Sequence, residues 1–358
     1  MDNSYYILAK DHVSIERLHI CTWEFPRESS FIEFGLEFPY ESFVNDSIIL
    51  YLAAPFIKED YTVTCLMKNL SNTDNGRFIF NDVVRGIENV GDDSRDGSIL
   101  SFEKRDKLTI LPCDIKVDNG FISFKLEKPS RYEGNLYFRV LIKIDNDSIA
   151  IRKKGIAQTG YIYDFKINET RNLPQDIYEL KKNNGLEICK VKKAFCLHAI
   201  PDNFVFSFVD SSKLKNIRKL ESTAFQKYLP EIKGISQDCF NILFLKDNDD
   251  DGKESYSLFT ICTEEAIGSK QIAFAIGANI ICSLLFALSS LRFIKDANVE
   301  WYRQIPWEYW GALVILFFLC LYLFVPIKSV WSWLKAKLNN LKSATIIQYT
   351  IKGRFMSR

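Results

Sequence analysis

The sequence predicts a mainly β domain, folded as an antiparallel sandwich or barrel, that is followed by a C-terminal two-helix transmembrane hairpin. Residues 1–265 contain many short runs in which apolar and polar residues alternate, and turn-forming clusters separate these runs. Residues 272–291 and 310–327 are instead continuous apolar runs without a charged residue. Alternation with period two is typical of strands that bury one face, and about 20 apolar residues suffice for a helix that crosses a bilayer.

The clearest predicted strand covers residues 32–38. Apolar residues occupy every second position there, and Pro39 ends the run. Further runs with similar composition are also predicted to be strands. They are residues 13–22, 47–53, 61–67, 121–126, 136–144, 161–167, 204–209, 240–245 and 256–262. Strands at this spacing favour antiparallel pairing, with one face of the sheet in water.

Other stretches interrupt this pattern. Residues 174–182 can form a helix with a proline in its first turn, and residues 212–229 place apolar side chains on one helical face. Residues 69–77 and 91–97 are rich in turn formers and are expected to be exposed loops. Residues 146–160 are a candidate boundary between two β modules. No internal repeat relates the two sides, so one continuous domain is the second interpretation.

The two apolar runs are predicted to be transmembrane helices at residues 271–292 and 310–327. The turn between them, residues 293–309, is short and rich in Trp and Tyr, whose rings favour the interface between lipid and water. Buried core helices are the alternative, but core helices rarely contain uncharged apolar runs of this length.

The distribution of charge orients the hairpin. The chain has 46 basic and 45 acidic residues, but residues 328–358 hold seven basic residues and no acid, so residues 1–327 carry a net charge of −6. Because basic segments remain in the cytoplasm, we expect this tail there, and two crossings place residues 1–265 on the same side. The N-terminus lacks a signal peptide, and nine scattered cysteines indicate reduced thiols. We therefore expect the inner membrane, with both termini cytoplasmic.

The first predicted span carries a stripe of small and polar residues. Ala275, Asn279, Ser283 and Ala287 follow one another at intervals of four, which places them on one helical face. An amide such as Asn279 is costly in hydrocarbon unless it finds a polar partner or water. The stripe therefore indicates a self-association face or a pore lining. The alternative is that Asn279 bonds across the hairpin to the second span.

No pattern in the sequence indicates catalysis. The chain contains only three histidines, and neither a phosphate-binding loop nor a nucleophile motif occurs. The spacing of Cys189, Cys196 and His198 fits no zinc site. The acidic run that begins at Asp247 has Leu258 where a calcium loop needs its bidentate Glu. We therefore expect no enzyme, no metal and no cofactor.

One predicted strand indicates a binding face. In residues 136–144, the positions of Tyr137, Arg139 and Lys143 share one face of the strand, opposite the apolar face. Two cations and an aromatic ring suit a nucleotide phosphate and its base, though not a nucleic-acid duplex. The basic loop Arg152, Lys153 and Lys154 would extend this face. The alternative is an ordinary solvated surface.

The order of strands and then a hairpin, over residues 161–327, resembles in layout the two-helix, β-rich membrane effectors of bacterial antiphage systems that cyclic nucleotides control. The resemblance implies that the soluble domain binds a cyclic nucleotide made by a partner nucleotidyltransferase. It also implies that the hairpins assemble as a homo-oligomer in the lipid bilayer and disrupt the inner membrane. The ligand could activate or inhibit. The competing interpretation is a membrane-tethered scaffold, or an interaction subunit of a larger membrane complex.

Overall fold

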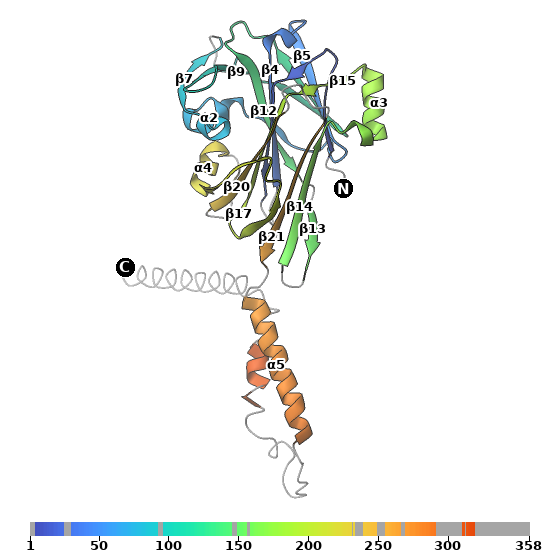
Figure 1. The fold of residues 1–358 in the computed structure, drawn as a ribbon, viewed down its shortest axis with the longest axis vertical. Coiled ribbons are helices and arrows are strands. Elements are labelled where there is room, and N and C mark those ends of the chain that lie inside the picture. The colour runs from blue at the N-terminus through green and yellow to red at the C-terminus, as the bar shows by residue number, and fades with distance from the viewer. Residues whose placement is uncertain are drawn as a thin grey trace, which may run out of the picture. The chain divides into compact units, whose positions relative to one another are not determined.

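The computed structural model describes residues 4–24, 30–91, 96–144, 149–155, 158–230, 232, 239–248, 255–265, 269–290, 310–311 and 313–318. The chain forms two compact units, Met1–Glu264 and Glu265–Arg358. The first unit consists mainly of strands, whereas the described part of the second is helical (Figure 1). The prediction of a mainly β domain is confirmed.

The first unit contains two large sheets. The first sheet has the order β10 (Asp114–Asp118), β11 (Phe121–Glu127), β5 (Ser47–Ala53), β1 (Ser4–Ala9), β14 (Gln158–Ile167), β21 (Tyr256–Glu265) and β18 (Phe204–Val209). In addition, β13 (Ile151–Lys154) pairs with β14, and β15 (Glu187–Ile188) pairs with β1. The short strands β2 (Ser14–Ile15) and β16 (Lys190–Val191) pair separately.

The second sheet has the order β19 (Leu214–Glu221), β20 (Cys239–Asn248), β17 (Lys193–Pro201), β3 (Arg17–Trp23), β4 (Ser30–Phe38), β12 (Asn135–Ile144), β9 (Leu108–Ile110), β8 (Ser98–Phe102) and β7 (Val84–Asn89). Strand β6 (Val63–Cys65) also pairs with β12. Most pairs are antiparallel, as predicted. Parallel pairing joins β3 to β17, β1 to β14, β9 to β12 and β2 to β16.

The two sheets pack face to face around one apolar core. Tyr5 of the first sheet contacts Phe34 of the second, with ring centroids 5.2 Å apart, and Phe124 contacts Phe138 at 5.3 Å. Strands from both sides of residues 146–160 contribute to each sheet. That stretch therefore does not separate two modules, and the interpretation as one continuous β domain is the one that the pairing supports.

Helices cover the outer faces of both sheets. The outer face of the second sheet packs against residues of α1 (Met67–Leu70), α2 (Thr73–Phe80) and α4 (Ser222–Tyr228). Helix α3 (Gln175–Asn184) covers the outer face of the first sheet at β1 and β5. Two short 3-10 turns lie at Tyr40–Ser42 and Thr170–Asn172. The expectation that one face of each sheet lies in water is therefore wrong where these helices pack.

Two local predictions need correction. Residues 69–77, predicted to be a loop, belong largely to α1 and α2, and the Asn72 side chain caps α2 by accepting a hydrogen bond from the backbone amide of Asp74 at 2.9 Å. Within residues 212–229, β19 pairs with β20, and helix begins only at Ser222. Pairing along a sheet edge prevails there over the helical spacing of apolar residues. The helix predicted at 174–182 is confirmed as α3, which ends at Gly185 with φ of 62°.

The second unit contains helix α5 (Ser269–Ser290), which holds most of the first predicted span. Residues 310–311 and 313–318 of the second predicted span are also helical. Among the residues that the structure describes, no helix is both long and apolar enough to cross a membrane. The predicted turn at 293–309 and the basic tail at 328–358 lie outside the described residues.

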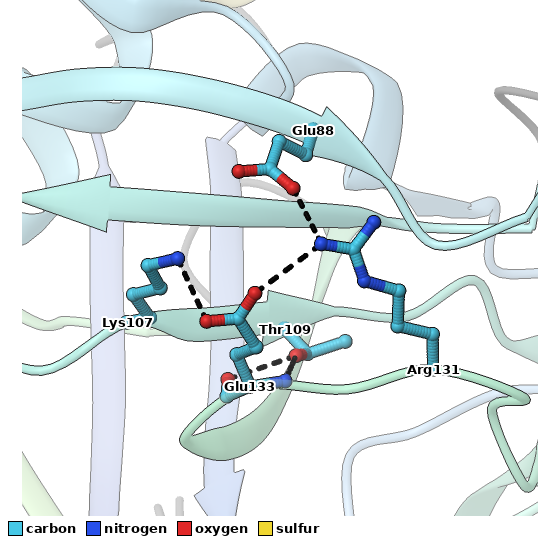
Figure 2. A network of polar contacts seen from close by, with 5 residues as sticks. All are labelled: Glu88, Lys107, Thr109, Arg131 and Glu133. Atoms are coloured by element: carbon cyan, nitrogen blue, oxygen red, sulfur yellow. Dashed lines mark hydrogen bonds and ion pairs between the residues drawn. The ribbon is translucent and has the colours of Figure 1, made fainter.

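A network of surface ion pairs fixes the entry into β12 (Figure 2). Arg131 donates to Glu88 at 2.6 Å and to Glu133 at 3.3 Å, and Lys107 pairs with Glu133 at 2.7 Å. The Thr109 hydroxyl accepts a hydrogen bond from the Glu133 amide and donates one to its carbonyl. Exposed ion pairs are individually weak, but a shared network holds one geometry better than isolated pairs do. The network positions the strand that carries the buried Tyr137 and Arg139.

His198 is buried inside the sandwich and is neutral at pH 7. Its Nδ1 is hydrogen-bonded to the Thr22 hydroxyl, and its ring lies 4.0 Å from that of Tyr163, centroid to centroid. Burial lowers the pKa of His198 to about 3. An exposed histidine in the unfolded chain has a pKa near 6.5, so the unfolded chain binds the proton first as the pH falls.

We therefore predict that the free energy of unfolding falls below pH 6.5 by about 1.4 kcal/mol per pH unit from this group, down to about pH 3. Urea unfolding of the full chain in detergent at pH 7 and pH 5 measures the loss. In His198→Gln this loss should shrink by about 2 kcal/mol. The exposed His12→Gln serves as the control and should behave as the wild type does. An equal pH dependence in His198→Gln and wild type would contradict the assignment.

Candidate functional site

The outer face of the second sheet buries two carboxylates. All nine residues of β4 are buried, and Glu33, Gly35 and Glu37 occupy its outer face beneath the helices. Gly35 lies opposite His19 of β3 and opposite Arg139 of β12. Since a buried carboxylate needs hydrogen bonds and a counter-charge, the groups around Glu33 and Glu37 define the chemistry of this face.

Glu33 forms a fully buried ion pair with Arg139. The Arg139 Nε donates to Glu33 Oε2 at 2.5 Å, and the two side chains are 2% and 0% exposed. Trp23 Nε1 donates to the other oxygen at 2.6 Å, and the Tyr228 hydroxyl of α4 donates to Oε2 at 2.7 Å. Burial opposes the charge on Arg139, but the Glu33 carboxylate outweighs it, so the pKa of Arg139 lies well above its usual value.

Gly35 makes room for a second polar cluster. A Cβ at this position would lie 1.9 Å from the Tyr137 hydroxyl oxygen, which no side chain could tolerate. That hydroxyl accepts a hydrogen bond from Arg139 Nη1 at 3.0 Å and is hydrogen-bonded to His19 Nδ1 at 3.0 Å. Burial, and then the charges of Arg139 and the neighbouring arginines, lower the pKa of His19 well below its usual value. His19 is therefore neutral at pH 7.

Glu37 gathers a separate set of partners. Arg105 Nη2 donates to Glu37 Oε2 at 2.9 Å, and Asn135 Nδ2 donates to Oε1 at 2.9 Å. Arg17 Nε lies 3.7 Å from Oε2. Two arginines thus share one carboxylate, which leaves this side of the face with an excess of positive charge.

A cavity of about 390 Å³ lies over this cationic face. Residues from α2, β3, β17, β19 and β20 contribute to its lining. The lining contains five cationic residues, Arg17, Arg105, Arg139, Lys215 and Lys246, and no described acidic residue. Glu33 and Glu37 lie beneath the cavity, where Glu33 pairs with Arg139 and Glu37 pairs with both Arg17 and Arg105. The cavity favours an anion.

Three phenylalanine rings also belong to the lining of the cavity. Phe80, Phe195 and Phe244 line it. The Arg105 guanidinium lies 5.1 Å from the Phe80 ring centroid, and the Lys246 ammonium lies 5.6 Å from that of Phe195. Cations next to ring faces suit a ligand that combines a negative charge with a flat ring, since such rings stack on aromatic side chains.

The predicted ligand residues are divided between three environments. Tyr137 and Arg139 are bonded to each other and buried, and Arg139 reaches the cavity. Lys143, on the same strand, is exposed and does not line it. Arg152, Lys153 and Lys154 are exposed on β13 of the first sheet. The prediction of one exposed binding face is therefore wrong, because α1, α2 and α4 cover the outer face of β12 over Tyr137 and Arg139.

The sequence interpretation missed the other cationic and aromatic residues of the cavity. Arg17, Arg105, Lys215 and Lys246 come from four segments far apart in the chain, so no local motif joins them. Lys215 also lay within the segment that was predicted to be a helix. The predicted assembly residues Ala275, Asn279, Ser283 and Ala287 all belong to α5. The Ser283 hydroxyl donates to the backbone carbonyl of Asn279 at 2.8 Å.

Compared with models of known protein families and with curated proteins, the sequence shows no match. In the described part of the chain, no group of three or more His, Cys, Asp or Glu side chains is arranged to hold a metal ion.

We predict that Arg139→Met destabilises the domain by about 3–5 kcal/mol, because Glu33 is then buried without its counter-charge. The double variant Arg139→Met/Glu33→Gln should recover part of this loss, since it buries no uncompensated charge. The exposed Lys143→Met on the same strand is the control and should change stability by less than about 0.5 kcal/mol. Urea unfolding at pH 7 measures all three. An Arg139→Met chain as stable as the control would show that Arg139 is not held by Glu33.

Proposed function

We propose that this chain is a membrane effector whose β domain binds a cyclic nucleotide and thereby controls the assembly of transmembrane hairpins that disrupt the inner membrane. The cavity of about 390 Å³ supports the proposed ligand, because five cationic residues and three phenylalanine rings line it. A partner nucleotidyltransferase would supply the ligand, and the chain itself would perform no catalysis.

The chemistry of the cavity matches the two parts of a nucleotide. Each phosphodiester carries one negative charge, and charge-assisted hydrogen bonds from arginine and lysine are the strongest that a protein offers it. Lys215 and Lys246 come from the neighbouring strands β19 and β20, so both can approach one phosphate group. Phe195 and Phe244 supply ring faces on which a base can stack.

The position of the cavity suggests how binding would be communicated. Phe244, Leu245 and Lys246 of β20 line the cavity, and the next strand along the chain is β21. Strand β21 ends at Glu265, and α5 begins at Ser269. A ligand that fixes β20 therefore acts on the strand that precedes β21 in the chain, although β20 and β21 belong to different sheets. Such an effect requires that the ligand bind one arrangement of these strands better than another.

Support for the membrane part comes from the sequence. Residues 272–291 and 310–327 are uncharged apolar runs, and residues 328–358 carry seven basic residues and no acid. This distribution favours two crossings with residues 1–265 and the tail in the cytoplasm. Asn279, Ser283 and the two alanines of the same stripe would then meet in neighbouring copies.

A membrane-tethered scaffold is the second candidate function. Strand β19 forms one edge of the second sheet, and its Ile217 side chain is 50% exposed. An unpaired edge can accept a strand from another protein. Nucleotide binding separates the two functions, because a scaffold has no use for a cationic, aromatic cavity.

We predict that the full chain in detergent binds a cyclic nucleotide and that Lys215→Gln/Lys246→Gln weakens binding about tenfold or more, because two charge-assisted contacts are lost. Calorimetry with cyclic di-AMP, cyclic di-GMP and cyclic GMP–AMP measures the affinity. The control, Lys143→Gln/Lys153→Gln, removes two exposed lysines outside the cavity and should bind as the wild type does. No binding by the wild type, or equal weakening in the control, would refute the ligand assignment.

We also predict that Asn279→Leu leaves membrane insertion intact but weakens assembly, because each interhelical contact of a polar side chain contributes about 0.6 kcal/mol on average and up to about 1.7 kcal/mol. The size of the detergent-extracted complex and dye entry into expressing cells are the two readouts. Ile281→Leu, two positions away and off the stripe, is the control. Wild-type size and dye entry in Asn279→Leu would mean that Asn279 serves only its own hairpin.

A further inference from the structure

Part of the outer face of the first sheet is apolar and exposed. Helix α3 packs its Ile177 against β1 and β5, which buries that half of the face. The other half consists of β13, β14, β21 and β18. There Ile151, Val205 and Phe208 are 40%, 54% and 51% exposed. These exposed aromatic and branched side chains lie on β13 and β18, the two strands that border this half, and they indicate a surface that meets a partner.

Strand β13 borders this apolar half and is basic. All four of its residues are exposed, and three of them are Arg152, Lys153 and Lys154. The Arg152 guanidinium lies 5.4 Å from the centroid of the Tyr161 ring, on the neighbouring strand. In the described part of the chain, none of the three cations forms an ion pair with a carboxylate. Their charge is therefore available to an external anion.

The basic strand lies beside the end of the domain that continues into α5. The Tyr161 hydroxyl donates to Glu264 Oε2 at 3.1 Å, and Glu264 is the penultimate residue of β21. Figure 1 shows the free end of the β13–β14 hairpin next to the C-terminal end of β21. Only residues 266–268 separate β21 from α5, and four peptide steps span at most about 14 Å.

We propose that the β13–β14 hairpin and the exposed apolar half of the first sheet rest on the surface of an anionic membrane. This inference rests on the proposed function, because it requires that α5 enters that membrane. Charge complementarity identifies the occupant. Anionic headgroups attract basic side chains within a Debye length of about 8–10 Å, and apolar side chains next to them enter the interface. Lys153 lies on the same face of β13 as Ile151, whereas Arg152 and Lys154 lie on its other face and reach the headgroups from the edge of the sheet. These three cations thus bind the lipid surface instead of the soluble ligand.

Asp164 of β14 and Glu264 of β21 are acidic residues of the strands that form this half of the sheet. Asp164 pairs with Lys166 at 3.6 Å, whereas Glu264 has neutral partners. It accepts hydrogen bonds from Tyr161 and, at 3.3 Å, from Asn203, so its charge is partly compensated. The alternative explanation for the three cations is protection of a sheet edge, because lysines on an edge strand discourage pairing with other chains. That explanation predicts no dependence on lipid charge.

The test uses the full chain in nanodiscs of phosphatidylcholine alone or of phosphatidylcholine with phosphatidylserine. Resistance to alkaline carbonate in cell membranes is established first. Hydrogen exchange of the amides in residues 151–164 is then measured in both discs. We expect roughly tenfold slower exchange in the anionic disc, and no difference between discs for Arg152→Gln/Lys153→Gln/Lys154→Gln. The matched control, Lys181→Gln/Lys182→Gln/Lys190→Gln, removes the same charge at and near α3 and should retain the slowing.

Exchange that is equal in the two discs, or slowing that persists in the Arg152 triple variant, would overturn the inference and leave the proposed function standing. A chain that carbonate washes from membranes would overturn the proposed function and this inference together. Loss of slowing in the α3 control as well would show a general charge effect and would also overturn the assignment to β13.

Discussion

The buried ion pair between Glu33 and Arg139 is the constraint on which the arrangement of the second sheet depends. Neither charge has water around it, so both must be satisfied by protein groups, and an uncompensated partner would cost several kcal/mol. Trp23 of β3 and Tyr228 of α4 complete the hydrogen bonding of Glu33. Strands β3, β4 and β12 and helix α4 are thereby fixed in one relative position. That position places Arg139 at the floor of the cavity.

The cavity combines cations of two kinds. Arg139 and Arg105 are held from below by Glu33 and Glu37, so their guanidinium groups are oriented in the absence of a ligand. Lys215 is exposed on an edge strand, and no carboxylate of the described residues holds its side chain in this way. A site with oriented charges at its floor and adjustable charges at its rim loses less conformational entropy on binding than a wholly exposed one.

The sequence predicted where the strands lie, but it did not predict that both faces of strands such as β4 and β12 are buried. Period-two alternation identified strands such as β4 and β12, because it reflects the pleat itself. It does not reveal that both faces are buried, since Tyr137 and Arg139 look like solvent-facing residues until α4 supplies Tyr228 to their cluster. The covering helices escaped detection because Asn72 and its polar neighbours resemble a loop. Lys215 and Lys246 could not be found at all, since only pairing of β19 with β20 brings them together.

The proposed soluble anionic ligand enters the cavity over Arg139, whereas the cations of β13 serve another surface. Acetylation of lysines in the full chain, with and without cyclic nucleotide, followed by mass spectrometry, tests this most directly. We expect the nucleotide to protect Lys215 and Lys246 and to leave Lys143, Lys153 and Lys154 as reactive as before. Protection of Lys143, Lys153 and Lys154, with Lys215 and Lys246 unchanged, would contradict it.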